Sequence, residues 1–187
     1  GINAGNLTMG STATQAYHAS YNTAVGYQSL SSNTTGNNNT AIGSFSLPSN
    51  TTGNNNTAIG LESLYSNTTG YQNTALGSYS LYSNTTGYNN TSLGVNSLYS
   101  NTTGYNNTAL GRVSLSANTT GSYNTGIGSY SLSSNTTSSF NTAAGAYSGY
   151  YISDGSTGNQ TSSNSIYLGY NTKALADGDT NETVIGY

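Results

Sequence analysis

Charged side chains are scarce in this chain. Of its 187 residues, two are Lys or Arg and five are Asp or Glu, so 4% are charged, against about 25% in ordinary soluble domains. The two cations, Arg112 and Lys173, offer almost no counter-charge to a phosphate backbone. The composition therefore argues against nucleic acid as a partner.

Cysteine and long apolar runs are missing as well. Without cysteine the chain has no disulfide framework and no thiolate metal site. No stretch resembles a spanning helix, so we expect no membrane insertion. Large aliphatic residues are few, which favours disorder. However, the net charge of −3 is smaller in magnitude than disordered chains usually carry. The first residues, GINAGNLTMG, and the last, VIGY, resemble cut edges of a longer repetitive protein.

A strict repeat is what the chain does have. The pattern Asn-Thr-small-aliphatic-Gly returns every 17 residues, with its asparagine at Asn22, Asn39, Asn56, Asn73, Asn90, Asn107, Asn124 and Asn141. A weaker copy ends at Gly10, and two divergent copies end at Gly169 and Gly186. The step from Gly145 to Gly169 is 24 residues, which indicates an insertion of 7 residues. A fixed period of this kind is typical of a solenoid, in which each repeat stacks on its neighbours.

The repeat divides the chain into three parts. We predict an irregular or capping segment over residues 1–21 and a regular solenoid over 22–149. Residues 150–187 then contain the insertion followed by the two divergent repeats.

The residue types favour strands and turns over helices. Each repeat holds glycines, β-branched threonines and an Asn-Thr-Thr-Gly corner, and no window has a helical apolar stripe. We predict an all-β solenoid, a parallel β-roll of about 17-residue coils. Each coil should hold two short strands, one around T-A-I-G and one around S-x-S-L. Strand spacing of about 4.7–4.9 Å then gives a rod roughly 50 Å long.

Two apolar columns run through the repeats. One holds the aliphatic residue before each glycine, such as Ile42 and Leu76, and the other holds a leucine, such as Leu47 and Leu81. Their near invariance predicts that both face inward, with the small residue before the aliphatic in tight packing. The five-residue offset would place them on opposite faces of one continuous strand. Either the glycine bends the chain, or one column faces a partner chain, and the thin interior favours oligomerisation.

These repeats resemble a known group of fibres. The N-T-A-aliphatic-Gly and S-L-x-S-N-T-T-G motifs, with the closing stretch NSIYLGYNTKALADGDTNETVIGY, are similar to the head-type repeats of trimeric autotransporter adhesins and of related bacteriophage tail fibres. The resemblance covers about residues 20–187. It implies a left-handed roll, a homotrimer, and an extracellular, cell-surface or virion-borne role in attachment.

Catalytic and metal-binding patterns are weak. One histidine, His18, has no carboxylate near it in sequence, and no serine lies in a nucleophile elbow, so we expect a non-enzyme without cofactors. Oxygen ligands alternate at Asp177, Asp179 and Asn181, as at the start of a Ca²⁺ loop, but the distal glutamate is missing. We interpret this stretch as a polar turn and keep it as a weak metal candidate.

Aromatic residues provide the candidate binding residues. Three columns recur at the repeat period: Tyr65, Tyr82 and Tyr99; Tyr71, Tyr88 and Tyr105; and Phe45, Tyr79 and Tyr130. Stacked coils would turn each column into a ladder that binds glycans, stiffens the rod or packs chains together.

Asparagine sequons recur as well. If the host glycosylates them, the Asn-Thr-Thr sites would carry sugar. These are Asn33, Asn50, Asn67, Asn84, Asn101, Asn118 and Asn135. The repeated threonines also raise ice binding, against which the variable outward columns argue.

The sequence thus predicts a structural fibre segment for adhesion or receptor binding, whose partners are copies of itself and a cell-surface glycan or receptor. The alternative is a self-assembling, glycosylated surface filament without a specific receptor.

Overall fold

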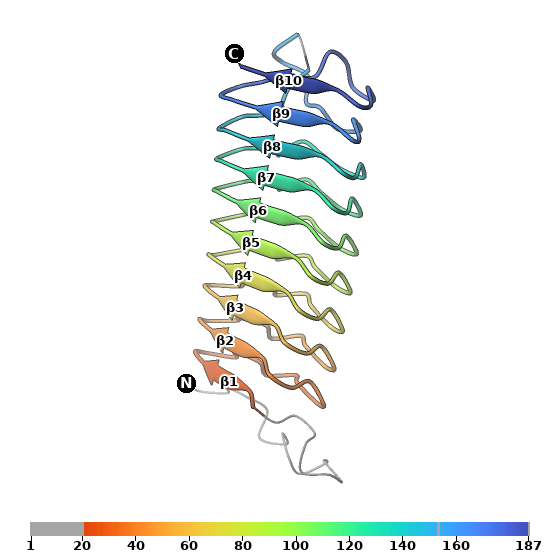
Figure 1. Cartoon of the computed structure of the whole chain (residues 1–187). Helices are drawn as coiled ribbons and strands as arrows, with labels where there is room; N and C mark the ends of the chain where they lie inside the picture. The colour runs from red at the N-terminus through yellow and green to blue at the C-terminus, as the bar shows by residue number, and fades with distance from the viewer. Residues whose placement is uncertain (1–20, 153, 187) are drawn as a thin grey trace.

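The computed structural model describes residues 21–152 and 154–186, and these form one β-solenoid (Figure 1). Residues 1–20 of the predicted capping segment, with the copy ending at Gly10 and His18, lie outside the described residues. Each coil contributes one strand of three residues, and the ten strands form a single parallel sheet in sequence order. They are β1 (Thr23–Val25), β2 (Thr40–Ile42), β3 (Thr57–Ile59), β4 (Thr74–Leu76), β5 (Thr91–Leu93), β6 (Thr108–Leu110), β7 (Thr125–Ile127), β8 (Thr142–Ala144), β9 (Ile166–Leu168) and β10 (Thr183–Ile185). The all-β solenoid of about 17-residue coils is confirmed, and the described part contains no helix.

Strand register follows the sequence period. Thr57 pairs with Thr74 and Ala58 with Ala75, an offset of 17 residues, whereas Thr142 pairs with Ile166, an offset of 24. The extra residues loop out before β9. Their loop closes on itself, because Ile152 N donates to Thr157 O at 2.9 Å and Asn159 N donates to Tyr150 O at 2.8 Å. Hydrogen bonds from Thr157 and Ser156 also lower the pKa of Asp154 to about 2. The insertion therefore leaves the stacking of the coils intact.

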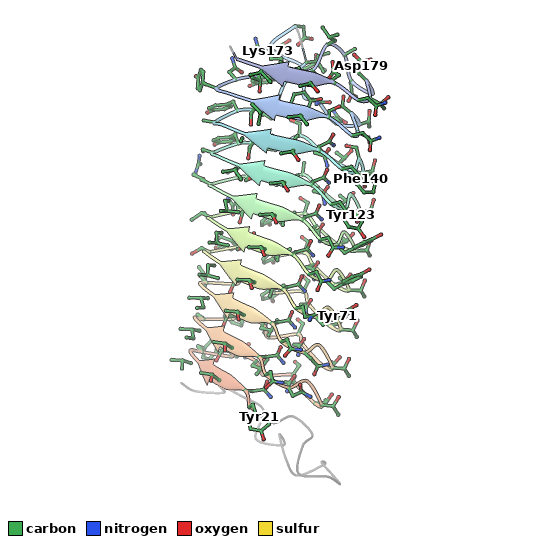
Figure 2. The ribbon with its side chains drawn as sticks, viewed as in Figure 1. Tyr21, Tyr71, Tyr123, Phe140, Lys173 and Asp179 are labelled. Atoms are coloured by element: carbon green, nitrogen blue, oxygen red, sulfur yellow. The ribbon has the colours of Figure 1, made fainter. Side chains whose placement is uncertain are left out.

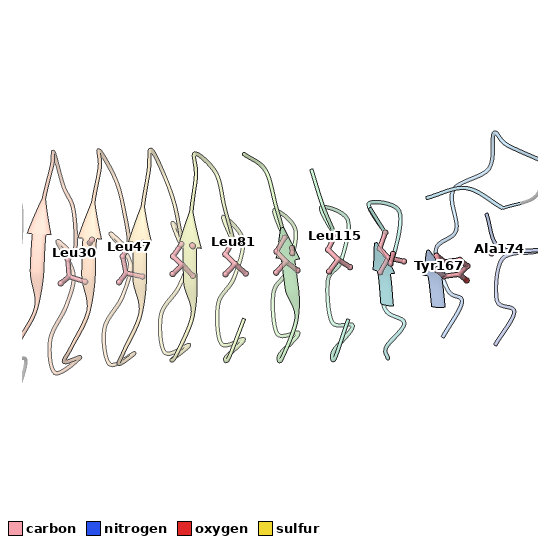
Figure 3. Close-up of a cluster of buried hydrophobic side chains, with 14 residues drawn as sticks. Leu30, Leu47, Leu81, Leu115, Tyr167 and Ala174 are labelled. Atoms are coloured by element: carbon pink, nitrogen blue, oxygen red, sulfur yellow. The ribbon is translucent and has the colours of Figure 1, made fainter. Parts of the chain in front are cut away.

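The interior is a narrow file of leucine and small side chains (Figure 3). The leucine column is fully or almost fully buried: Leu30, Leu47, Leu64, Leu81, Leu98, Leu115 and Leu132. The middle residue of most strands points at it, as Ala41, Ala58, Ala75 and Ala109 do, and Tyr167 and Ala174 continue the file into the last coils. The predicted burial of the leucine and small columns is confirmed.

The aliphatic column does not face inward, and that prediction is wrong. Alternation along a strand places the residues on either side of a buried alanine on the outer face. Ile42 is 38% exposed and Ile127 is 45% exposed. The next residue, a glycine such as Gly77, has φ +132, where a Cβ would lie 2.7 Å from the backbone of Gly94. This glycine turns the chain and brings the leucine four residues later back into the core.

The second predicted strand, around S-x-S-L, is also absent from the described coils. After Gly77 the chain takes a positive φ at Tyr79 (59°) and again at Leu81 (53°), so it curls instead of extending. A buried serine fixes this curl: Ser63 Oγ donates to Gly60 O at 3.2 Å, three residues earlier. The narrow core therefore holds one strand per coil, and a tight turn places the leucine side chain in it.

Two buried asparagine ladders stabilise the coils. In the first, Asn84 Nδ2 donates to Asn67 Oδ1 at 2.8 Å and to Gly87 O at 3.0 Å, and neighbouring coils repeat the pair. In the second, the backbone N of Asn73 donates to Asn56 Oδ1 at 3.0 Å, and Asn73 Nδ2 donates to Gly87 O at 2.8 Å. Hydrogen-bonded amides therefore supply much of the specificity that a larger apolar core would provide.

Candidate functional site

Two of the predicted aromatic columns form ladders. Tyr65, Tyr82 and Tyr99 stack with ring centroids 5.1 Å apart at both steps and interplanar angles of 11° and 5°. The spacing matches the distance between coils because each ring comes from the same position of its coil. In the structure these tyrosines form a continuous edge of parallel rings.

The second ladder lies on the Asn-Thr-Thr-Gly side of the coil. Tyr71, Tyr88 and Tyr105 stack at 4.9 and 4.8 Å. Tyr123 and Phe140, which the column comparison missed, extend it: they stack at 5.0 Å, and Tyr123 meets Tyr105 edge-on at 5.3 Å (Figure 2). Both sit one position later in the repeat, so a search at a single fixed position overlooks them.

The third column, which also includes Tyr147, is not a continuous ladder. Glu62, Asn96 and Val113 occupy its intervening coils. Its first two rings pack beside the first ladder: Phe45 lies 6.3 Å from Tyr65, and Tyr79 lies 6.1 Å from Tyr82, between ring centroids. Its last two rings, Tyr130 and Tyr147, stack on each other. We call the surface of Tyr27, Phe45, Tyr65, Tyr79, Tyr82 and Tyr99 the aromatic face.

A second group of rings begins after a gap. Tyr130 stacks on Tyr147 at 5.0 Å, and Tyr150 contacts both, with centroids 6.3 Å from Tyr130 and 6.0 Å from Tyr147. Tyr150 falls 17 residues after Ser133, so the period could have placed it in the first column. The Arg112 guanidinium lies 5.2 Å from the centroid of the Tyr130 ring.

Ring stacking perturbs two phenols. Burial, followed by the negative charge of Glu62, raises the pKa of Tyr82 above its ordinary value. Burial and the neighbouring phenols Tyr105 and Tyr71 raise the pKa of Tyr88. Both phenols therefore hold their protons more tightly than a free tyrosine does.

The outer face of the sheet is a second candidate surface. Every strand from β1 to β8 begins with an outward threonine, and most end with an outward aliphatic such as Val25, Ile59 or Leu76. The parallel register aligns both columns along the rod. We call this surface the sheet face; it is flat, uncharged and half apolar.

Corner threonines divide into two columns with different roles. The first threonine of each Asn-Thr-Thr bonds the next coil, as Thr85 Oγ1 donates to Thr102 O at 3.1 Å. The second is exposed in every described coil: Thr35, Thr52, Thr69, Thr86, Thr103, Thr120 and Thr137. Every residue of this outward column is threonine, whereas the outward columns on which the sequence argument against ice binding depended are variable.

Another feature of the coils is the burial of the asparagines at the predicted Asn-Thr-Thr glycosylation sites. Asn33, Asn50, Asn67, Asn84, Asn101, Asn118 and Asn135 are all buried. Both amide protons of Asn50 are donated, to Asn33 Oδ1 at 2.8 Å and to Gly53 O at 3.0 Å. A glycan on this nitrogen would break the ladder, and glycosylation of these asparagines stays a prediction. Other sequon asparagines, such as Asn55 and Asn89, are exposed.

The weak metal candidate is a set of turn contacts. Asp177 Oδ1 accepts hydrogen bonds from Gln160 N and Thr161 N, both at 2.8 Å, and Asp179 Oδ2 accepts one from Ala176 N at 3.0 Å. Asn181 N donates to Ser163 O at 3.1 Å, as expected for a repeat position. Within residues 21–152 and 154–186, no three His, Cys, Asp or Glu residues gather to hold a metal ion.

Comparison of the chain with protein-family models, with curated proteins and with solved structures found no match. Across the described residues, no helix is both long and apolar enough to cross a membrane. The candidate surfaces are therefore judged on their own geometry.

Proposed function

We propose that this chain is a non-enzymatic rod segment of an extracellular, cell-surface or virion-borne attachment fibre, and that it works as a homotrimer. The rod spaces and presents surfaces, and its aromatic ladders contact a glycan or receptor. The motif resemblance to adhesin heads and phage tail fibres supports this role, as does the elongated coil stack (Figure 1).

The single observation that carries the proposal is the exposed aliphatic column of the sheet face. Val25, Ile127 and Ile185 are 52%, 45% and 73% exposed in the isolated chain. A regular apolar stripe of this length is unusual on a monomer surface and marks an interaction site. A second copy of the chain is the natural occupant, because it carries the same column at the same spacing and no charge to oppose it.

The aromatic ladders supply the attachment surface. Each ring offers apolar area and a phenolic hydroxyl at low conformational cost, a combination typical of recognition surfaces. With few charged residues in the chain, recognition depends on stacking and on neutral hydrogen bonds rather than on electrostatic steering.

Sedimentation equilibrium tests the assembly. We expect three times the chain mass of 19.2 kDa. Leu76→Asp, a charge in the middle of the sheet face, should dissociate the trimer, because an unpaired charge is expensive to bury in an interface. Thr86→Asp adds the same charge at the exposed corner and should leave the mass unchanged. A native chain that sediments at the monomer mass contradicts the proposal, and mass that grows without limit into filaments supports end-to-end polymerisation instead.

A further inference from the structure

The first tyrosine ladder has a break two coils wide. At its position of the repeat the chain reads Tyr65, Tyr82, Tyr99, Ser116, Ser133 and Tyr150, so two rings are replaced by serine. Among the described residues, the only ring that packs on Tyr99 is Tyr82, which leaves the opposite face of Tyr99 open. We call the groove between Tyr99 and Tyr150 the ladder break.

The ladder break is a shallow, open groove. One part, of about 290 Å³, is lined by Asn96, Tyr99, Val113 and Ser116. The other, of about 330 Å³, is lined by Val113, Ser116, Tyr130, Ser133, Tyr150 and Gln160. Because the two parts share Val113 and Ser116, they form one groove across the coils. Its size is within the range of small-ligand sites.

An unpartnered hydroxyl lies in this groove. Ser133 is 6% exposed, and its Oγ has no hydrogen-bond partner. Buried hydroxyls are usually paired, and leaving one unpaired costs stability. By contrast, Ser116 Oγ, in the same column, donates to Ser133 O at 3.4 Å. The unpaired Ser133 hydroxyl is therefore available to bond a ligand group that enters the groove.

The lining defines the chemistry of the ligand. Tyr99 and Tyr150 bound the groove with aromatic surface, and Ser, Asn and Gln side chains line the space between them. None of the lining residues is charged, and the nearest cation, Arg112, is engaged with Tyr130, to whose hydroxyl its Nη1 donates at 2.5 Å. Three coil steps separate Tyr99 from Tyr150, or about 14 Å at the strand spacing. This is room for two flat ring-sized units in the places of the two missing tyrosines.

We infer that the ladder break binds a neutral oligosaccharide that lies along the groove, over the positions where Ser116 and Ser133 replace tyrosine. The apolar face of one sugar packs on Tyr99, and a sugar hydroxyl bonds Ser133 Oγ. This inference rests on the proposed role in attachment and assigns that role to one site. It also separates the site from the unbroken ladders, whose ring faces are covered by each other.

Titration calorimetry with the whole chain tests the inference, using cellotetraose, chitotetraose and maltotetraose at millimolar concentration as probes. We expect at least one of them to bind. Tyr99→Ala should weaken that binding at least tenfold. Tyr21→Ala is the matched control: it also removes an exposed tyrosine ring, but one that lies outside both ladders and the groove, and it should leave binding unchanged.

Two further variants separate binding from folding. Ser116→Tyr extends the existing stack and fills the groove, so it should abolish binding while the midpoint of urea unfolding stays the same or rises. Ser133→Ala removes the orphan hydroxyl, so it should weaken binding several-fold without lowering that midpoint. A destabilised Ser133→Ala variant would show that the hydroxyl is structural.

The result that overturns the inference is no binding of any probe, or equal weakening by Tyr99→Ala and Tyr21→Ala. Sedimentation of the same samples keeps the two proposals apart. A monomer that binds a probe through Tyr99 would contradict the trimer and support the site. A trimer without such binding would support the trimer and contradict the site.

Discussion

Asn84 offers the sharpest test of what stabilises the rod. It lies in the middle of the first asparagine ladder and is fully buried. Its Nδ2 donates to Asn67 Oδ1 at 2.8 Å and to Gly87 O at 3.0 Å, and its Oδ1 accepts from Asn101 Nδ2 at 2.9 Å. Asn84→Ala removes all three hydrogen bonds.

The expected cost follows from the groups that lose their partners. Gly87 O keeps the bond from Asn73 Nδ2 at 2.8 Å, but Asn67 Oδ1 loses its donor and one Asn101 N–H loses its acceptor. A buried polar group left unpaired costs about 1–3 kcal/mol, and two groups are affected, so we expect Asn84→Ala to lower the free energy of unfolding by about 2–6 kcal/mol. That is a large share of the stability of an ordinary domain, about 5–15 kcal/mol.

Urea unfolding followed by far-ultraviolet circular dichroism measures this cost. Thr86→Ala, two residues away on the exposed corner, is the control and should change the free energy by less than about 0.5 kcal/mol. Hydrogen exchange should show the loss of protection centred on the coils beside Asn84. The reasoning is refuted if Asn84→Ala costs no more than Thr86→Ala at an unchanged urea dependence.

Two other predictions concern the turn glycines and the tyrosines. Gly77→Ala should cost at least about 3 kcal/mol in urea unfolding, because strained φ alone costs about 1–3 kcal/mol and the new Cβ would lie 2.7 Å from the backbone of Gly94; an Ala variant as stable as the native chain would contradict the turn geometry. The raised pKa values of Tyr82 and Tyr88 mean that the folded state holds these protons more tightly than the unfolded state. Stability from this source is present below about pH 10, the ordinary pKa of tyrosine, and should be lost as pH rises through the folded values. Unfolding across alkaline pH measures it, and Tyr82→Phe should flatten the decline; a decline that stays the same in this variant would count against a role for Tyr82.

Most of the fold could be predicted from the period of the sequence. The 17-residue repeat, its Gly and Asn corners and the leucine column predicted the coil, the parallel stacking and the core. The aliphatic column was misassigned and a second strand was wrongly expected, because the backbone after each glycine curls through positive φ at residues such as Tyr79 and Leu81. A positive φ is uncommon for large residues, so the residue types at these positions do not predict it.

The candidate sites were predictable in part. Rings at a fixed repeat position became ladders, as for Tyr71 and Tyr88, because the pitch of the coils equals a stacking distance. The burial of Asn84 could not be read from the sequence, since Asn-Thr-Thr-Gly is equally typical of an exposed turn. In the sequence, the ladder break shows only as serines at positions 116 and 133. That these positions form a groove with an unpaired Ser133 hydroxyl could be seen only in the structure.

Deletion of one coil tests the in-register stack most directly. Removing residues 74–90 joins Asn73 to Thr91 and restores the repeat with one strand fewer, whereas removing residues 74–82 joins Asn73 to Ser83 and breaks the period. Measured by urea unfolding, the 17-residue deletion should keep a cooperative transition close to that of the native chain, and the shorter deletion should abolish or severely weaken it. Equal behaviour of the two deletions would contradict the account.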